Sequence, residues 1–151
     1  MVALLCQALL SVRMAALIIV GISLLEVGIP ISGGLLMRIV DSKSLLNLVG
    51  WHPVFDYWWK WSVMLLWGQF LFPFLIGFTA AQLARAKEMV ICGALATWTE
   101  ASVLTICFRN TFIEHSHIQT GWFILNSWPM VALVLAGAFA RRRALNSLLI
   151  D

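Results

Sequence analysis

The sequence predicts an all-α fold, an integral membrane four-helix bundle with both termini cytoplasmic. Three observations predict it. Apolar residues make up 62% of the 151 residues and charged residues only 11%, whereas an ordinary soluble domain has roughly 45–50% and about 25%. Four apolar runs are long enough to cross a bilayer, which takes about 20 residues. Lys and Arg are also more frequent on one side of these runs than on the other.

This composition excludes several other classes of protein. The apolar content excludes a disordered chain. Three cysteines without a C-x-x-C pair fit neither a disulfide scaffold nor a quinone-linked thiol oxidase. The basic residues are scattered between apolar runs, so we expect no nucleic-acid partner. The lipid bilayer is the expected surrounding, and residues 1–151 form a single transmembrane domain.

The predicted helices cover residues 14–37, 62–84, 89–108 and 121–140. Glu26 is the only charged residue of the first run, the second has none, and the third carries Glu100. The fourth run ends at the arginine triplet 141–143, which is typical of a cytoplasmic anchor. The connection between the second and third runs is so short that these helices must be antiparallel neighbours.

Two segments lie outside these runs. The apolar stretch 1–12 could extend the first helix or lie in the membrane interface. The loop 38–61 is aromatic, with six aromatic rings in the eleven residues 51–61. Since Trp and Tyr favour the headgroup zone, we expect this loop to lie on the outer face of the membrane.

The distribution of basic residues predicts the orientation. One side carries Arg13, Arg85, Lys87, Arg141, Arg142 and Arg143, and the other carries Arg38, Lys43, Lys60 and Arg109. The excess of Lys and Arg marks the cytoplasmic side, so both termini are expected there. A multi-pass protein of the bacterial cytoplasmic (inner) membrane is the expected localisation.

One strong hydrogen-bonding side chain falls near the middle of each predicted helix. These are Glu26, Gln69, Glu100 and Asn126. At 1.5 Å per residue they occupy a layer roughly 5 Å thick near the midplane. Such groups either join helices by hydrogen bonds or bind a proton or an ion. Joining helices is favoured for Gln69 and Asn126, whereas the two readings are balanced for the glutamates.

Two prolines follow two of these polar residues. Pro30 has no N–H for the carbonyl of Glu26, and Pro73 stands in the same relation to Gln69. The pattern predicts a broken helical hydrogen-bond ladder at both polar residues. Broken helices near the midplane are typical of ion sites in transporters, although proline is also commoner in membrane helices in general.

Small residues spaced four apart predict where the helices approach each other. They are Gly77 with Ala81; Gly93 with Thr97 and Ala101; and Ala132 with Ala136 and Ala140. Trp67 and Trp98 lie well inside their helices, and we expect them to fill space there.

No catalytic motif is present, and the protein is not expected to be an enzyme or to bind a cofactor. His52, His115 and His117 are weak candidates for a zinc or copper site, because their spacing is generic. All three fall in predicted loops, which argues against a haem inside the bundle. An interfacial lipid-modifying enzyme using His52, Asp56 or the third loop is the third alternative for function.

The segment Ser23-Leu24-Leu25-Glu26-Val27-Gly28 resembles the first helix of small multidrug-resistance exporters. The resemblance covers about a dozen residues and implies that Glu26 would exchange drug for protons. The chain is also similar to small four-helix bacterial membrane proteins of unassigned function. That similarity lies in residues 77–85 and 92–95 and implies no activity.

These observations leave two leading functions. The first is an accessory or structural membrane subunit, alone as a homo-oligomer or within a larger membrane complex. The second is a small proton- or cation-coupled transporter that uses Glu26 and Glu100.

Overall fold

The computed structural model describes residues 2–40, 53–84, 87–109 and 126–148. These residues are helical almost throughout and contain no strand, which confirms the all-α prediction. The elements are α1 (Val2–Ser23), η1 (Leu24–Gly28), α2 (Ile29–Val40), α4 (Pro53–Leu65), η2 (Leu66–Leu71), α5 (Phe72–Ala84), α6 (Glu88–Phe108) and α8 (Trp128–Leu148). The short elements η1 and η2 are π-helical turns inside two longer helical rods.

Three helical stretches of the described chain are long and apolar enough to cross a membrane. They are Leu10–Val40, Trp58–Ala84 and Glu88–Phe108. They correspond to the first three predicted runs. The fourth run begins in residues 121–125, outside the described residues, and its described part continues in α8 beyond the arginine triplet to Leu148.

The first two rods are also longer than the predicted helices. The N-terminal stretch extends the first helix, because α1 begins at Val2. The segment 38–61, expected to be a loop, is helical from Pro53 onward in α4 and up to Val40 in α2. Proline suits the first turn of a helix because its missing N–H would have no partner there. Part of the aromatic run therefore continues the second rod.

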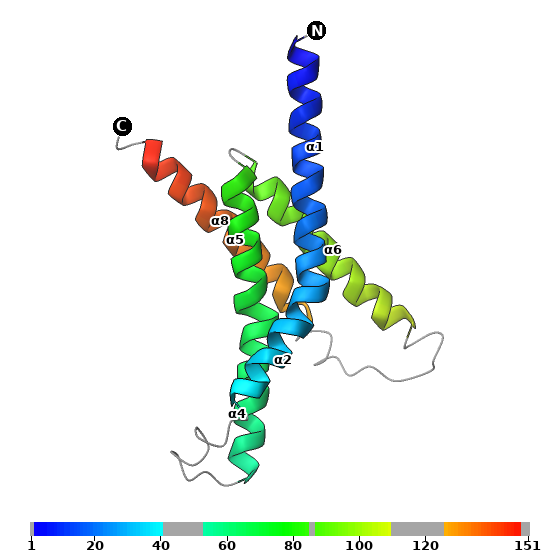
Figure 1. The fold of residues 1–151 in the computed structure, drawn as a ribbon, viewed down its shortest axis with the longest axis vertical. Coiled ribbons are helices and arrows are strands. Elements are labelled where there is room, and N and C mark those ends of the chain that lie inside the picture. Colours follow the sequence, from blue (N-terminus) through cyan, green and yellow to red (C-terminus); the bar gives the residue numbers. More distant parts are fainter. Residues whose placement is uncertain (1, 41–52, 85–86, 110–125, 149–151) are drawn as a thin grey trace.

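The rods alternate in direction (Figure 1). The start of α1, the end of α5, the start of α6 and the end of α8 all lie toward one end of the molecule. The rods α1–η1–α2 and α4–η2–α5 run side by side, and α6 and α8 cross them obliquely, running in opposite chain directions. The described helices thus form a splayed arrangement in which the first rod bends at η1.

The tightest packing joins α5, α6 and α8. Gly77 and Ala81 on α5 face Ala136 and its neighbours on α8, and all of them are buried. A Cβ added at Gly77 would lie 2.8 Å from Leu133 Cδ2 and 3.2 Å from the Cβ of Ala136. The predicted approach of small residues on these two helices is therefore found in the structure.

The stripe of small residues on α6 does not mark a contact among the described helices. A Cβ added at Gly93 would meet nothing within 4 Å, and Thr97 and Ala101 are exposed. The buried face of α6 is instead formed by Ile91, Cys92, Leu95 and Ala96. Small-residue spacing shows where helices can approach, but the rotation of α6 turns this stripe outward.

Candidate functional site

Both predicted breaks in the helical ladder are present as π-helical turns. Glu26 lies in η1, four residues before Pro30, and Gln69 lies in η2, four residues before Pro73. A π turn inserts one residue into the helix and shifts the hydrogen-bond pattern to i→i+5. This shift accommodates a carbonyl that proline has deprived of its N–H donor. The backbone at both polar residues is therefore irregular, as their proline spacing predicts.

The two irregular turns pack across each other. A Cβ added at Gly28 would lie 2.7 Å from Phe72 Cζ, and one at Gly68 would lie 3.3 Å from Ile29 Cγ2. Glycine therefore permits the first rod to approach the second at the height of η1 and η2. Trp67 stands at the same crossing, where its Nε1 donates a hydrogen bond to Ser32 Oγ at 2.9 Å. The hydrogen bond between Trp67 and Ser32 thus joins the two rods where they cross.

Glu26 is held by α6. The Nε1 of Trp98 donates a hydrogen bond to Glu26 Oε1 over 3.1 Å. Glu26 is exposed and Trp98 is 46% exposed, so this pair lies on the outside of the contact between the first rod and α6. Trp98 therefore does more than fill space, because it is the hydrogen-bond donor to a carboxyl inside an apolar span.

Glu100 has a different partner. Ser127 Oγ donates to Glu100 Oε1 over 3.3 Å, which joins α6 to the start of α8. The other oxygen, Oε2, is buried and has no hydrogen-bond partner within the described part of the chain. A buried carboxyl oxygen without a donor is costly. Of the two glutamates, Glu100 is therefore the one with a buried carboxyl oxygen that has no hydrogen-bond donor among the described residues.

Gln69 and Asn126 meet, as their predicted common depth allows. Gln69 Nε2 lies 3.5 Å from Asn126 Oδ1, at the long limit of a hydrogen bond. Asn126 is itself helical and lies two residues before α8, which begins at Trp128 after a turn at Ser127. Ser127 just before the helix and Pro129 in its first turn are signals of a helix start at this point.

The four polar residues form two groups. Asn126 and Ser127 are adjacent in the chain, and they bring Gln69 and Glu100 to one cluster. Glu26 is separate, because its partner Trp98 and Glu100 lie about 160° apart around α6. The two glutamates bind different neighbours on different faces of this helix, so the geometry does not support a proton-sharing pair.

A cavity lies beside the Gln69 cluster. Its volume is about 510 Å³, and it is lined by Gln69 and Ser62 together with Leu65, Leu66, Phe70 and Trp128. The amide of Gln69 is thus in reach of a small solute in the cavity, while its Nε2 also contacts Asn126. A polar side chain in a mostly apolar wall is the usual composition of a small-molecule site.

The candidate metal ligands fall outside what the structure describes. His52, His115 and His117 lie in residues that are not described, and so does the side chain of Asp56. Within the described residues, no group of three His, Cys, Asp or Glu side chains could hold a metal ion. The weak metal prediction therefore stays a prediction.

Two residues at the site, Trp98 and Ser127, have roles that the sequence analysis did not assign. The sequence shows only that each of them has a side chain that can donate one hydrogen bond from inside an apolar run. Ser127 could also be found as the residue before Trp128-Pro129, in the position of a helix cap. For Trp98 no sequence signal specifies Glu26 as the acceptor, because that contact depends on how α6 crosses the first rod.

The described site supports two kinds of chemistry. The hydrogen bonds of Glu26, Gln69 and Glu100 each join different helices, which is how polar groups hold a membrane bundle together. The free Oε2 of Glu100 could in addition accept a proton or a small cation. No protein-family model, curated protein or solved structure matches this chain.

Proposed function

We propose that this chain is an accessory or structural subunit of a membrane assembly, folded as a multi-pass four-helix bundle with both termini in the cytoplasm. The observation that carries the proposal is the exposed pair of Glu26 and Trp98. A carboxyl at the centre of a membrane helix costs roughly 2.5–3.5 kcal/mol even on the mildest scale. One indole N–H satisfies only part of its hydrogen-bonding capacity. Protein, rather than lipid, fits this face best.

The exposed surface of α6 supports the same conclusion. Gly93, Thr97 and Ala101 lie along its outward face, and their small side chains would allow another helix to approach closely. The hydroxyl of Thr97 is bonded to the carbonyl of Gly93 within the helix. This face of α6 therefore has only small side chains beside the exposed carboxyl of Glu26, and a second helix could pack closely against it. The covering helix belongs either to a second copy or to another subunit.

Photo-crosslinking in native membranes tests this proposal. A photoreactive residue at Val27, which is 57% exposed beside Glu26, should crosslink to protein. The matched position Val134, 42% exposed on α8, should crosslink mainly to lipid. A product of twice the 16.9 kDa of one chain would identify a second copy. Lipid adducts alone at both positions would reject the subunit proposal.

Substitution at Glu26 sharpens the test. Glu26→Gln keeps the hydrogen-bonding capacity and should preserve the crosslinked complex. Glu26→Leu loses it and should weaken the complex, while the helix content of the chain stays unchanged. An equal yield of complex with both variants would show that the carboxyl does not contribute to the interface.

A second function, proton- or cation-coupled transport, is favoured by one specific observation, the buried Oε2 of Glu100, which has no hydrogen-bond partner among the described residues. On this alternative Glu100, and not Glu26, carries the exchangeable proton or cation. Glu100→Gln should then abolish flux driven by a pH gradient in proteoliposomes, whereas Glu26→Gln should leave it unchanged. Carbodiimide labelling of Glu100 that varies with pH would support this function, and labelling independent of pH would argue against it.

A further inference from the structure

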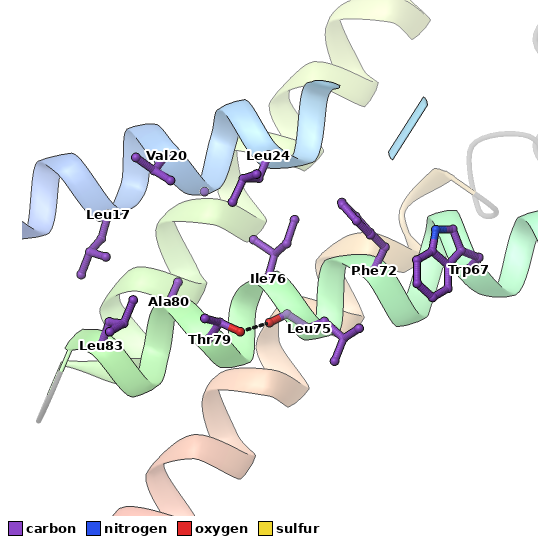
Figure 2. A pocket seen from close by; sticks show the side chains of 11 residues that line it. Leu17, Val20, Leu24, Trp67, Phe72, Leu75, Ile76, Thr79, Ala80 and Leu83 are labelled. Carbon is purple, nitrogen blue, oxygen red and sulfur yellow. Dashed lines mark hydrogen bonds between the residues drawn. The ribbon is translucent and has the colours of Figure 1, made fainter. Parts of the chain in front are cut away.

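An apolar groove separates α1 from α5 along one face of the molecule (Figure 2). Its volume is about 280 Å³. From the first rod it is lined by Leu17 and Val20 of α1 and by Leu24 of η1, and from α5 by Ile76, Ala80 and Leu83. The two rods approach closely at Phe72, which lies beside Gly28 of η1, and again at Leu83, whose carbonyl accepts a hydrogen bond from Arg13; the groove lies between these two points. The groove therefore opens sideways, toward the hydrocarbon of a surrounding bilayer.

The polar atoms in the groove wall already have partners. Thr79 Oγ1 donates to the carbonyl of Leu75 at 2.8 Å, as the dashed line in Figure 2 marks. Trp67, at one end of the groove, donates its Nε1 to Ser32 on the first rod. No polar group of these two side chains is left for a solute. The wall thus suits a hydrocarbon chain and offers little to a polar molecule.

The part of the groove that lies along α5 matches one leaflet of a membrane in length. This part runs from Phe72, which Gly28 of the first rod approaches, to Leu83, eleven residues further along the chain. At 1.5 Å per residue this is about 16 Å along the helix. Half of the hydrocarbon core of a bilayer is about 15 Å. An acyl chain lying in the groove would therefore run from the headgroup zone to the midplane.

Positive charge lies at the Leu83 end of the groove. Arg13 is exposed, and its Nη2 donates to the carbonyl of Leu83 at 2.8 Å. A guanidinium has five N–H donors, and this bond occupies one of them. Lys87 is also exposed. It follows Ala84, the last residue of α5, by three residues, so the Cα atoms of the two residues lie within about 11 Å of each other. Glu88, the acidic side chain next to Lys87, is 8% exposed and contributes little to this surface.

We propose that this groove is a binding site for an anionic glycerophospholipid. One acyl chain lies between α1 and α5, and the phosphate headgroup is bound by Arg13 with Lys87 nearby. The apolar wall selects for a lipid, and the cationic end selects for a negative headgroup. Leu24, which lines the groove, and Glu26 are two residues apart in η1 and therefore lie on nearly opposite sides of the first rod. The site is thus independent of the subunit interface proposed above.

Native mass spectrometry of the full chain tests the site. The protein is transferred to detergent micelles that contain equal amounts of phosphatidylglycerol and phosphatidylcholine with identical acyl chains. The wild-type chain should retain phosphatidylglycerol with about a fivefold preference, the size of effect expected for one basic side chain near an anionic headgroup. Arg13→Gln should reduce this preference to near one, and Arg13→Lys should keep most of it.

A second variant tests the groove itself. Val20→Trp should fill the space between the rods and reduce retention of both lipids about fivefold or more. Val90→Trp is the matched control, because Val20 is 55% exposed and Val90, outside the groove on α6, is 60% exposed. Arg38→Gln is the control for loss of a positive charge elsewhere. An unchanged preference in Arg13→Gln, or equal retention by the two tryptophan variants, would overturn the proposal.

Discussion

Helix α5 packs more closely against α8 than against α1. Toward α8, the contact is made by Gly77, Ala81 and Ala136, and a single added methyl group would collide. Toward α1, leucine and valine side chains line a groove of about 280 Å³. In a membrane the hydrophobic effect does not press helices together, so close contact depends on how well their surfaces fit. Small side chains supply that fit toward α8, whereas large ones leave a groove beside the contact with α1.

The strongest test of this comparison is to enlarge a residue in the close contact. Gly77→Leu should destabilise the fold by about 3 kcal/mol, the upper end of the usual range for overpacking, because its Cβ alone would lie 2.8 Å from Leu133. Unfolding in mixed micelles, followed by circular dichroism, measures the change. Gly93→Leu is the control and should not destabilise, because none of the described residues lies within 4 Å of its added Cβ.

Emptying the same contact should have the next largest effect. Leu133 is fully buried, and Leu133→Ala should cost about 2 kcal/mol, the low end of the range for such changes in soluble cores. The low end applies because lipid, not water, receives the side chain on unfolding. Leu24→Ala, in the groove and 48% exposed, should cost much less in the same assay. Equal costs would show that the two contacts are packed alike.

Cysteine accessibility reports on the close contact without changing it. Cys92 is buried and its Sγ donates to the carbonyl of Gly77 at 3.3 Å, whereas Cys107 is half-buried. In a Cys6→Ser background, N-ethylmaleimide should label Cys92 about tenfold more slowly than Cys107, which corresponds to about 1.4 kcal/mol. The two thiols should react alike in the unfolded chain. Similar rates in the folded chain would contradict a tight core.

The smallest effect is expected at the contact between Gln69 and Asn126. Their 3.5 Å separation is long, so the coupling energy in a double-mutant cycle with leucine should be about 0.6 kcal/mol, the average for such pairs in membranes. Denaturation of the two single variants and the double variant gives this value. A coupling well above 1 kcal/mol would mean that this cluster, rather than the small-residue contact, holds α8 in place.

Residue patterns within one helix predicted local backbone features, but they did not predict which residues of different helices would be in contact. The proline spacing correctly predicted irregular turns at Glu26 and Gln69, because a missing N–H acts on a carbonyl four residues away in the same helix. Gln69 and Asn126 were predicted to lie at equal depth, and their side chains are in contact in the structure. The partners of the two glutamates were not predictable, since a contact between helices depends on the rotation of each about its axis.

The sequence by itself therefore determined the all-helical, apolar character of the chain, the places where two rods are irregular, and the small-residue faces of α5 and α8. Each follows from composition or from residues within one or two helical turns. Only the tertiary structure decided that Glu26 meets Trp98, that Glu100 meets Ser127, and that Arg13 closes the end of the groove. Those contacts join residues 27 to 72 positions apart, and their geometry is set by how the rods cross.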